Sequence, residues 1–485
     1  MSSAIMLDGA GRRFRTLHCC LQLPQLARVG QKAQTAHLVL DLLQVPLLHE
    51  DAMDAKTFEA AVIKKIAWRI LPLILVSYCI AYIDRANIAV AALTMNKDLG
   101  FSAFTYGLGA GIFFLGYFIF EVPSNLILER VGARRWIARI MFTWGVISAS
   151  CAFVTGQTSF LIIRFLLGVA EAGFFPGVVL YFTYWFPDRY RGRILAMLYL
   201  AIPVANALSN LVSGAILDGM NGLLGLRGWQ WVFIIEAAPA VLLSFVVFRT
   251  LIDRPALATW LESDERQWLE KELNDERTKA EGLGRLTLGG ALRDSRVVAL
   301  SMIYFLSVTA GYGTTFFLPQ IVKGLGLSNF MTGVASAIPY LVGMIALLIW
   351  GWSSDRTGER RWHLIAASVV AGIGFVAAGV AGNSFWALAA MSLALVGLYG
   401  TRPTFWPLPS MFLSGTAAAG GIALINSIGN LGGYVGPFLV GWIKDSTNSF
   451  EAALYFLAAC TLASGALVLL ARRACAPRAV RYAGE

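Results

Sequence analysis

The sequence contains Glu129-Arg130-Val131-Gly132-Ala133-Arg134-Arg135-Trp136 and, 226 residues later (129 to 355), repeats the pattern as Asp355-Arg356-Thr357-Gly358-Glu359-Arg360-Arg361-Trp362. Each copy follows an apolar segment of about 20 residues, which is long enough to cross a bilayer as a helix. An acid, a glycine and paired arginines suit a water-exposed turn between two such helices. The repeat therefore predicts a membrane protein built from two similar halves.

The composition indicates a lipid environment. Of the 485 residues, 57% are hydrophobic and 14% are charged, and the mean hydropathy is +0.65. Soluble domains have nearer a quarter of charged residues. We expect an all-α membrane protein with twelve transmembrane helices in two parallel, pseudo-symmetric six-helix halves. The expected helices are 68–91, 104–128, 137–156, 159–181, 194–217, 229–250, 297–321, 330–352, 363–382, 385–408, 416–442 and 450–471.

Polar stretches divide the chain into five parts. Residues 1–52 form a leader that we expect to be disordered or not native, because Met53 opens a cleaner start to the first membrane helix. The other parts are the N-terminal six-helix half at 53–252, a cytoplasmic linker at 253–296, the C-terminal six-helix half at 297–472 and a cytoplasmic tail at 473–485.

The net charge of +10 follows the membrane topology and does not indicate nucleic-acid binding. The loops assigned to one side are rich in arginine, whereas those of the other side carry only Lys97, Arg227, Lys323 and Lys444. By the positive-inside rule the arginine-rich side is cytoplasmic, and so are both termini. We expect a multi-pass monomer in the inner (plasma) membrane, surrounded by the lipid bilayer.

Several motifs carry a resemblance to a known family. The doubled acid-Arg-x-Gly-x-Arg-Arg turn resembles the signature of the major facilitator superfamily of secondary transporters. More narrowly, the chain resembles the anion:cation symporter family, in particular bacterial permeases for organic acids such as tartrate, phthalate and hydroxyphenylacetate. The motifs that carry this narrower resemblance are 82–87, 121–125, 164–173 and 426–433. Asn125 departs from the glycine that usually begins the superfamily motif, whereas Gly351 keeps it.

Inserting an ionisable side chain at the centre of a membrane helix costs about 2.5–3.5 kcal/mol of free energy. Each such residue is therefore expected to have a structural or functional role. The resemblance implies that Asp84 and Glu171 are the proton-coupling pair and that Arg85 and Arg164 bind the substrate. Position along the helices places both arginines in the outer half of the membrane, where two guanidiniums can hold a carboxylate. Asp84 is expected to balance Arg85 when the site is empty. The alternative is a static ion-pair network that holds the helices together.

Other candidate residues lie near these charges. Arg402, in a segment with two prolines, is either a second anion contact that would match a dicarboxylate or an arginine that snorkels to the cytoplasmic surface. Glu121 and Glu236 are interpreted as structural. The remaining candidate substrate contacts, for which helix packing is the alternative, are Tyr82, Tyr117, Trp406, Asn426 and Asn430.

The repeated turns are predicted to act as a gate. Their acids and first arginines, Glu129, Arg130, Asp355 and Arg356, are expected to form a charge latch that holds the outward-facing state. The alternative is that these charges only set the topology.

The sequence therefore predicts a proton-coupled symporter that imports a small organic anion, a mono- or dicarboxylate, by alternating access. We expect no cofactor and no enzymatic activity, because the chain has no P-loop and no metal-ligand spacing of Cys and His. Two alternatives stay open. One is an anion exchanger of the organophosphate type, which needs an arginine pair without the acids, and the other is a transport-dead membrane sensor.

Overall fold

The computed structural model describes residues 34–281, 294–410 and 415–471, with side chains described for 57–278, 294–409 and 421–471. Over these ranges the chain is built of helices and contains no strand. The chain divides into two units, Met1–Lys64 and Lys65–Glu485. The described part of the first unit is the beginning of helix α1 (Gln34–Leu99), and all other helices belong to the second unit.

Part of the predicted leader is helical. Helix α1 begins at Gln34, inside the segment 1–52 that was expected to be disordered or not native. Residues 34–52 are rich in leucine, a good helix former, and contain one proline, Pro46. Residues 1–33 and the predicted tail 473–485 lie outside the described residues.

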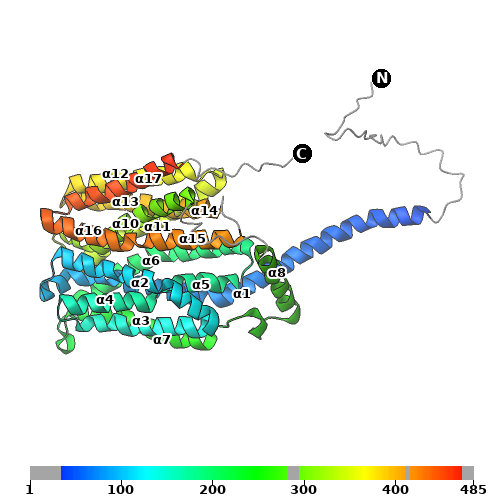
Figure 1. The fold of residues 1–485 in the computed structure, drawn as a ribbon, viewed down its shortest axis with the longest axis horizontal. Coiled ribbons are helices and arrows are strands. Elements are labelled where there is room, and N and C mark those ends of the chain that lie inside the picture. The colour runs from blue at the N-terminus through cyan, green and yellow to red at the C-terminus, as the bar shows by residue number, and fades with distance from the viewer. Residues whose placement is uncertain (1–33, 282–293, 411–414, 472–485) are drawn as a thin grey trace, which may run out of the picture. The chain divides into compact units, whose positions relative to one another are not determined.

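The second unit contains two groups of helices, which Figure 1 shows one above the other. The N-terminal group continues α1 with α2 (Ala103–Val131), α3 (Ala133–Ser150), α4 (Gln157–Glu171), α5 (Phe174–Thr183), α6 (Asp188–Gly219) and α7 (Gly228–Thr250). The C-terminal group comprises α10 (Ser295–Lys323), α11 (Asn329–Thr357), α12 (Arg361–Ala381), α13 (Phe385–Phe405), α14 (Pro407–Ser410), α15 (Gly415–Asn430), α16 (Gly432–Thr447) and α17 (Glu451–Leu470).

The membrane spans agree with the predicted segments. In the described part of the chain, 11 helices are long and apolar enough to cross a membrane. The predicted span 416–442 corresponds to α15 and α16, which follow each other with a break at Leu431 and have 16 residues each. Each of these is shorter than a bilayer requires, but together they cover the predicted segment.

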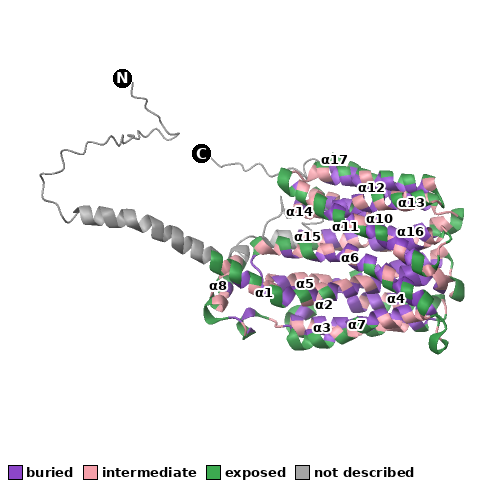
Figure 2. Ribbon diagram, turned by 180° about the vertical axis from the view of Figure 1, so that it is seen from behind, coloured by how far each residue is buried: buried purple, intermediate pink, exposed green. Residues whose placement is uncertain are grey.

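Outward-facing side chains on the helices are largely apolar. Figure 2 shows buried residues between the helices and exposed residues on the outside of the bundle. Exposed residues include Leu242, Phe245, Ile349 and Val380. In water such a surface would be an aggregation site, whereas hydrocarbon chains solvate it at no cost.

The two copies of the repeated turn occupy equivalent places. Gly132 separates α2 from α3 with φ +96°, and Gly358 ends α11 with φ +65°. Both angles lie in the region that favours glycine, which explains the fixed glycine of the motif. We call the end of the bundle that carries these turns the motif end.

At the opposite end, two aspartates join the two halves. Asp445, in the last turn of α16, accepts hydrogen bonds from the backbone N–H groups of Ala103 (3.0 Å) and Phe104 (2.8 Å) at the start of α2. Asp218, in the last turn of α6, accepts one from Phe330 (2.8 Å) at the start of α11. Each carboxylate therefore caps a helix N-terminus of the other half, where negative charge is stabilised. We call this end the clasp end.

Glycines allow the helix backbones to approach closely at the clasp end. Gly441 of α16 lies against the backbone of Ala103, and Gly214 of α6 lies against Gly333 of α11. A side chain at Gly441 or Gly333 would collide with the facing backbone, and one at Gly214 would be tightly packed against it. In this conformation the two halves are therefore packed together at the clasp end.

Asp445→Ala is expected to loosen this contact. Removing a capping side chain costs about 1 kcal/mol, so the population opened at the clasp end should rise about fivefold. Hydrogen–deuterium exchange of the peptide covering 103–111 measures this change. Glu451→Ala, at a neighbouring exposed acid whose carboxylate accepts a hydrogen bond from Tyr455 of its own helix, is the control. Equal exchange in both variants would contradict the clasp.

The linker helix α8 (Ser263–Glu281) is attached to the N-terminal half. Its ion pairs are Lys65–Glu265 (2.7 Å), Arg189–Glu272 (2.6 Å) and Arg191–Glu276 (2.8 Å). Exposed pairs contribute little individually, but three along one helix fix its position. The helix also contacts α15 of the C-terminal group.

Candidate functional site

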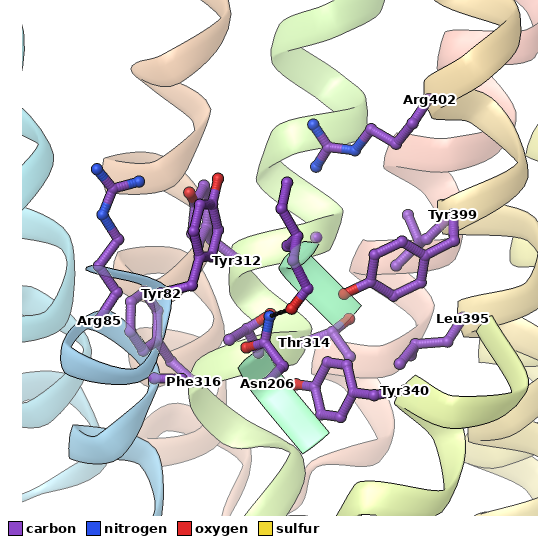
Figure 3. Close-up of a pocket in the computed structure, with 15 residues that line it drawn as sticks. Tyr82, Arg85, Asn206, Tyr312, Thr314, Phe316, Tyr340, Leu395, Tyr399 and Arg402 are labelled. Carbon is purple, nitrogen blue, oxygen red and sulfur yellow. Dashed lines mark hydrogen bonds between the residues drawn. The ribbon is translucent and has the colours of Figure 1, made fainter. Parts of the chain in front are cut away.

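A cavity lies between the two halves and has two lobes. The space not filled by atoms, including the part open to solvent, is about 590 Å³ in the first lobe and about 500 Å³ in the second. Tyr82, Arg85, Ile202, Tyr312 and Arg402 line both lobes. The first lobe, shown in Figure 3, is further lined by Asn206, Thr314, Thr315, Tyr340 and Tyr399. The second is further lined by Tyr117, Tyr199, Tyr304, Asn426 and Asn430.

The cavity carries an uneven charge. Arg85 comes from α1 in one half and Arg402 from α13 in the other, and Figure 3 shows them on opposite walls. Among the described residues that line the two lobes, none is an aspartate or a glutamate. The lining thus presents two guanidiniums, of which Arg85 is compensated by Glu171 outside the lining, and this arrangement favours an anionic guest.

Arg85 is held by one carboxylate and three aromatic rings. Its Nε donates to Glu171 Oε1 at 2.6 Å, and its Nη2 lies 2.5 Å from the same oxygen. Its guanidinium carbon lies 5.1–5.4 Å from the ring centroids of Tyr82, Phe113 and Tyr117. Both charges are buried, so each depends on the other for compensation.

A break in the helix places Glu171 at a helix end. Glu171 is the last residue of α4, and Gly173 adopts φ +86° before α5 begins. A side chain at Gly173 would meet Ser124 of α2, so the position requires glycine for both its angle and its surroundings. Broken helices of this kind occur in membrane proteins where they border a cavity.

Asp84 does not pair with Arg85, and the sequence-based expectation that it would balance that charge is wrong in this conformation. Asp84 is buried and accepts hydrogen bonds from Trp144 Nε1 (2.9 Å) and Ser148 Oγ (3.0 Å) of α3. Adjacent residues of a helix point about 100° apart, so Asp84 faces α3 while Arg85 faces the cavity. Asp84 is thus a buried acid bonded by two neutral donors.

Arg164 does not line the cavity either. It is fully buried, its Nε donates to the carbonyl of Gly109 at 3.3 Å, and it lies 5.3 Å from the ring of Phe113. Its two terminal nitrogens have no partner in the described part of the chain. The two-arginine fork expected from Arg85 and Arg164 is therefore absent from this conformation. The position of a residue along a helix does not determine which way its side chain points around the helix axis. The side chain of Arg164 points toward α2.

Arg402 projects into the cavity and not toward the bilayer surface. Its Nη1 donates to the hydroxyl of Tyr304 at 3.3 Å, and within the described residues it has no acidic partner. Its helix α13 ends at Phe405, between the two prolines at 403 and 407. The structure thus supplies, from the C-terminal half, the uncompensated cation that Arg164 does not provide.

The asparagines of α15 lie on the second lobe. Asn426 and Asn430 both line it, and Asn426 also donates to Glu121 Oε1 at 3.2 Å. Ser427 donates to the other oxygen of Glu121 at 3.3 Å. Glu121 therefore joins the two halves, in agreement with a structural contact.

The predicted aromatic contacts separate into two groups. Tyr82 and Tyr117 line the cavity and flank Arg85. Trp406 is not among the lining residues; it stacks on Tyr199 at 6.2 Å and meets Tyr304 edge-on at 5.0 Å. Tyr199 and Trp406 come from opposite halves, so this stack lies across the interface between them.

The four predicted gate residues make no bond to the opposite half among the described residues. Asp355 pairs with Arg360 of its own turn at 2.5 Å, and Arg356 lies 5.4 Å from the ring of Trp352. Glu129 and Arg130 are exposed. A latch formed in another conformation stays a prediction.

Several residues of the cavity were missed by sequence reasoning. They are Asn206, Tyr304, Tyr312, Tyr340 and Tyr399. For the tyrosines the sequence carries no signal, because aromatic residues are common in the packing of membrane helices. Asn206 could have been predicted, because burying an amide in the middle of an apolar helix costs free energy unless the amide is hydrogen-bonded. No group of three or more possible metal ligands occurs within the described residues.

Comparisons with known proteins agree with this architecture. The sequence model of the Major Facilitator Superfamily matches residues 74–437 and 300–482. A protein of Agrobacterium vitis named "Putative tartrate transporter" is 50% identical over 434 residues, which cover 90% of this chain and 96% of that protein. The quinolone resistance transporter of Acinetobacter baumannii is 44% identical, covering 82% of this chain and 92% of that protein.

A solved structure shows the same fold. The xylose transporter XylE from E. coli, in a partially occluded inward-open conformation, superposes with a TM-score of 0.65 and 14% identity, covering 83% of this chain and 98% of that one. The prediction of an all-α fold of this type is confirmed. By its sequence and its fold, the chain belongs to the major facilitator superfamily of membrane transporters.

Proposed function

We propose that this protein is a proton-coupled symporter that imports a small organic anion, with a dicarboxylate as the preferred substrate. One observation carries the proposal: the cavity between the halves is lined by Arg85 and Arg402 from opposite walls, with no carboxylate in the described lining. An anion with one carboxylate at each guanidinium would neutralise Arg402 and replace Glu171 at Arg85. Arginine suits carboxylates because its planar fork can bond both oxygens.

The relatives support an organic acid as the substrate class. The relative with 50% identity is named for tartrate, which carries two carboxylates. The relative with 44% identity is named for quinolone resistance, so proteins this similar to the chain are named for chemically different compounds. The choice of an organic acid as the substrate therefore rests on the residues that line the cavity.

Proton coupling follows from competition for Arg85. A substrate carboxylate that bonds Arg85 displaces Glu171, which is buried beside it. An isolated buried carboxylate is costly, so Glu171 takes up a proton when it loses its arginine. Asp84, a second buried acid without a cation bonded to it, accepts a proton in the same cycle. Arg164 acts from behind Phe113 as a positive charge near both acids.

The arginine-rich motif end is proposed to be cytoplasmic. The clasp end then faces the outside of the cell. Because the two halves are packed together at that end, the conformation described is closed to the outside. Opening outward requires the two aspartate caps to break, and the charges of the repeated turns are proposed to close the cytoplasmic side at that stage.

Uptake into proteoliposomes tests the proposal. With purified protein, labelled tartrate should accumulate under an inward proton gradient, and a protonophore should abolish the accumulation. Liposomes without protein are the control. Uptake that depends only on an internal counter-anion would favour exchange, and the absence of transport for every acid tried would favour a sensor.

A further inference from the structure

Two buried polar atoms face the first lobe without a partner. Asn206 Oδ1 and the hydroxyl of Tyr340 make no hydrogen bond within the described residues. Asn206 is 3% exposed and Tyr340 is 1% exposed, and both line the lobe. Figure 3 shows both at the end of the lobe that lies away from Arg402. Leaving such groups unpaired in a folded protein is unfavourable, so each is a candidate for bonding a guest.

Both atoms are held in place by the surrounding structure. Asn206 Nδ2 donates to the carbonyl of Ile202 at 2.9 Å, so its oxygen is the atom left free. The ring of Tyr340 packs edge-on against Tyr399 at 6.5 Å, and Thr315 lies near its hydroxyl but not within hydrogen-bond geometry. One atom comes from α6 and the other from α11, so the pair spans the two halves just as Arg85 and Arg402 do.

We propose that Asn206 and Tyr340 form a hydroxyl-recognition subsite that makes the transporter selective for hydroxylated dicarboxylates. This inference rests on the proposed function, in which the two carboxylates bind Arg85 and Arg402. The carbon chain between them then borders the first lobe, and a hydroxyl on that chain donates to Asn206 Oδ1. A second hydroxyl exchanges a hydrogen bond with Tyr340, which can donate as well as accept.

The chemistry of the pair explains why hydroxyls would be selected. An unhydroxylated acid of the same length satisfies both arginines but leaves the two buried atoms unpaired. A site that is built to bond a hydroxyl rejects the analogue lacking it far more strongly than an apolar pocket rejects an added group. We therefore expect the preference to depend on these two side chains and not on the arginines, which bind both acids equally.

Transport of tartrate and of succinate into proteoliposomes measures this preference. Tartrate and succinate have the same carbon chain and two carboxylates, and only tartrate carries hydroxyls. The wild type should transport tartrate with a kcat/KM at least about tenfold above that of succinate. Tyr340→Phe and Asn206→Leu should each lower the value for tartrate about tenfold and leave that for succinate within about twofold.

Asn210→Leu is the matched control. Asn210 lies one turn further along α6, is buried, has a free Oδ1 and donates Nδ2 to the carbonyl four residues earlier, as Asn206 does. It does not line either lobe. Asn210→Leu should therefore keep the wild-type ratio between the two acids. Succinate uptake reports in each variant that the protein is folded and active.

The outcomes separate this inference from the proposed function. If the wild type transports both acids without preference, or if both variants keep the preference, the subsite is overturned while the dicarboxylate transporter stands. If each variant loses both acids equally, the residues are structural and the subsite is again overturned. If the wild type transports neither acid, the proposed dicarboxylate function fails, and this inference fails with it.

Discussion

Glu171→Gln is expected to abolish uptake driven by a proton gradient while exchange of internal for external substrate continues. Glu171 is buried and is the carboxylate bonded to Arg85. Glutamine keeps the shape and can still accept the hydrogen bond, but it cannot take up or release a proton. The substrate would then bind and cross without a coupled proton, so accumulation against a gradient should fall to the level of liposomes without protein.

Two assays on the same proteoliposomes test this expectation. One follows tartrate accumulation with an inward proton gradient, and the other follows exchange with tartrate inside and no gradient. Glu451→Gln, at an exposed acid of the clasp end, is the control and should behave as the wild type in both. Gradient-driven accumulation that survives in Glu171→Gln would show that another group carries the proton.

Arg402→Met is expected to lower uptake of a dicarboxylate by about a hundredfold and to spare a monocarboxylate. Hydrogen bonds to charged groups contribute about 1.5–3 kcal/mol each, and a carboxylate can take two from one guanidinium. Arg402 has no acidic partner among the described residues and bonds only Tyr304. Removing it therefore leaves no unpaired carboxylate behind, so the fold should persist.

Arg85→Met provides the contrast. Arg85 compensates the buried Glu171, so its loss would leave that carboxylate unpaired, and both classes of acid should be affected. Initial uptake rates of tartrate and of lactate, with binding measured on detergent-purified protein, distinguish the two variants. If Arg402→Met loses both acids to the same extent, Arg402 maintains the structure and does not select a second carboxylate.

The larger part of the fold could be predicted from local sequence. The repeated turns that begin at Glu129 and Asp355 indicate the duplication. Each predicted apolar segment is covered by a helix or by a pair of successive helices. These features are local, because a run of about 20 apolar residues in lipid must satisfy its own backbone and can do so only as a helix. The glycines of the turns follow from the positive φ that the chain reversal requires.

The candidate site could be predicted only in part. The buried charges Asp84, Arg85 and Glu171 stood out in the sequence because ionisable groups are rare in membrane helices. Their partners could be predicted only in part. The sequence led us to expect that Asp84 balances Arg85, with an ion-pair network between helices as the alternative. The structure bonds Arg85 to Glu171, 86 residues away, and Asp84 to α3.

Sequence alone therefore determines the spans, the duplication, the positions of the turns and the identity of the rare buried charges, because each depends on residues close together in the chain. Only the tertiary structure decides which charges meet. Arg402 shares the cavity with Arg85, and Arg164 lies behind Phe113, because each helix is rotated about its axis by its packing partners. The rotation is set by contacts such as Gly441 on Ala103, between residues hundreds of positions apart.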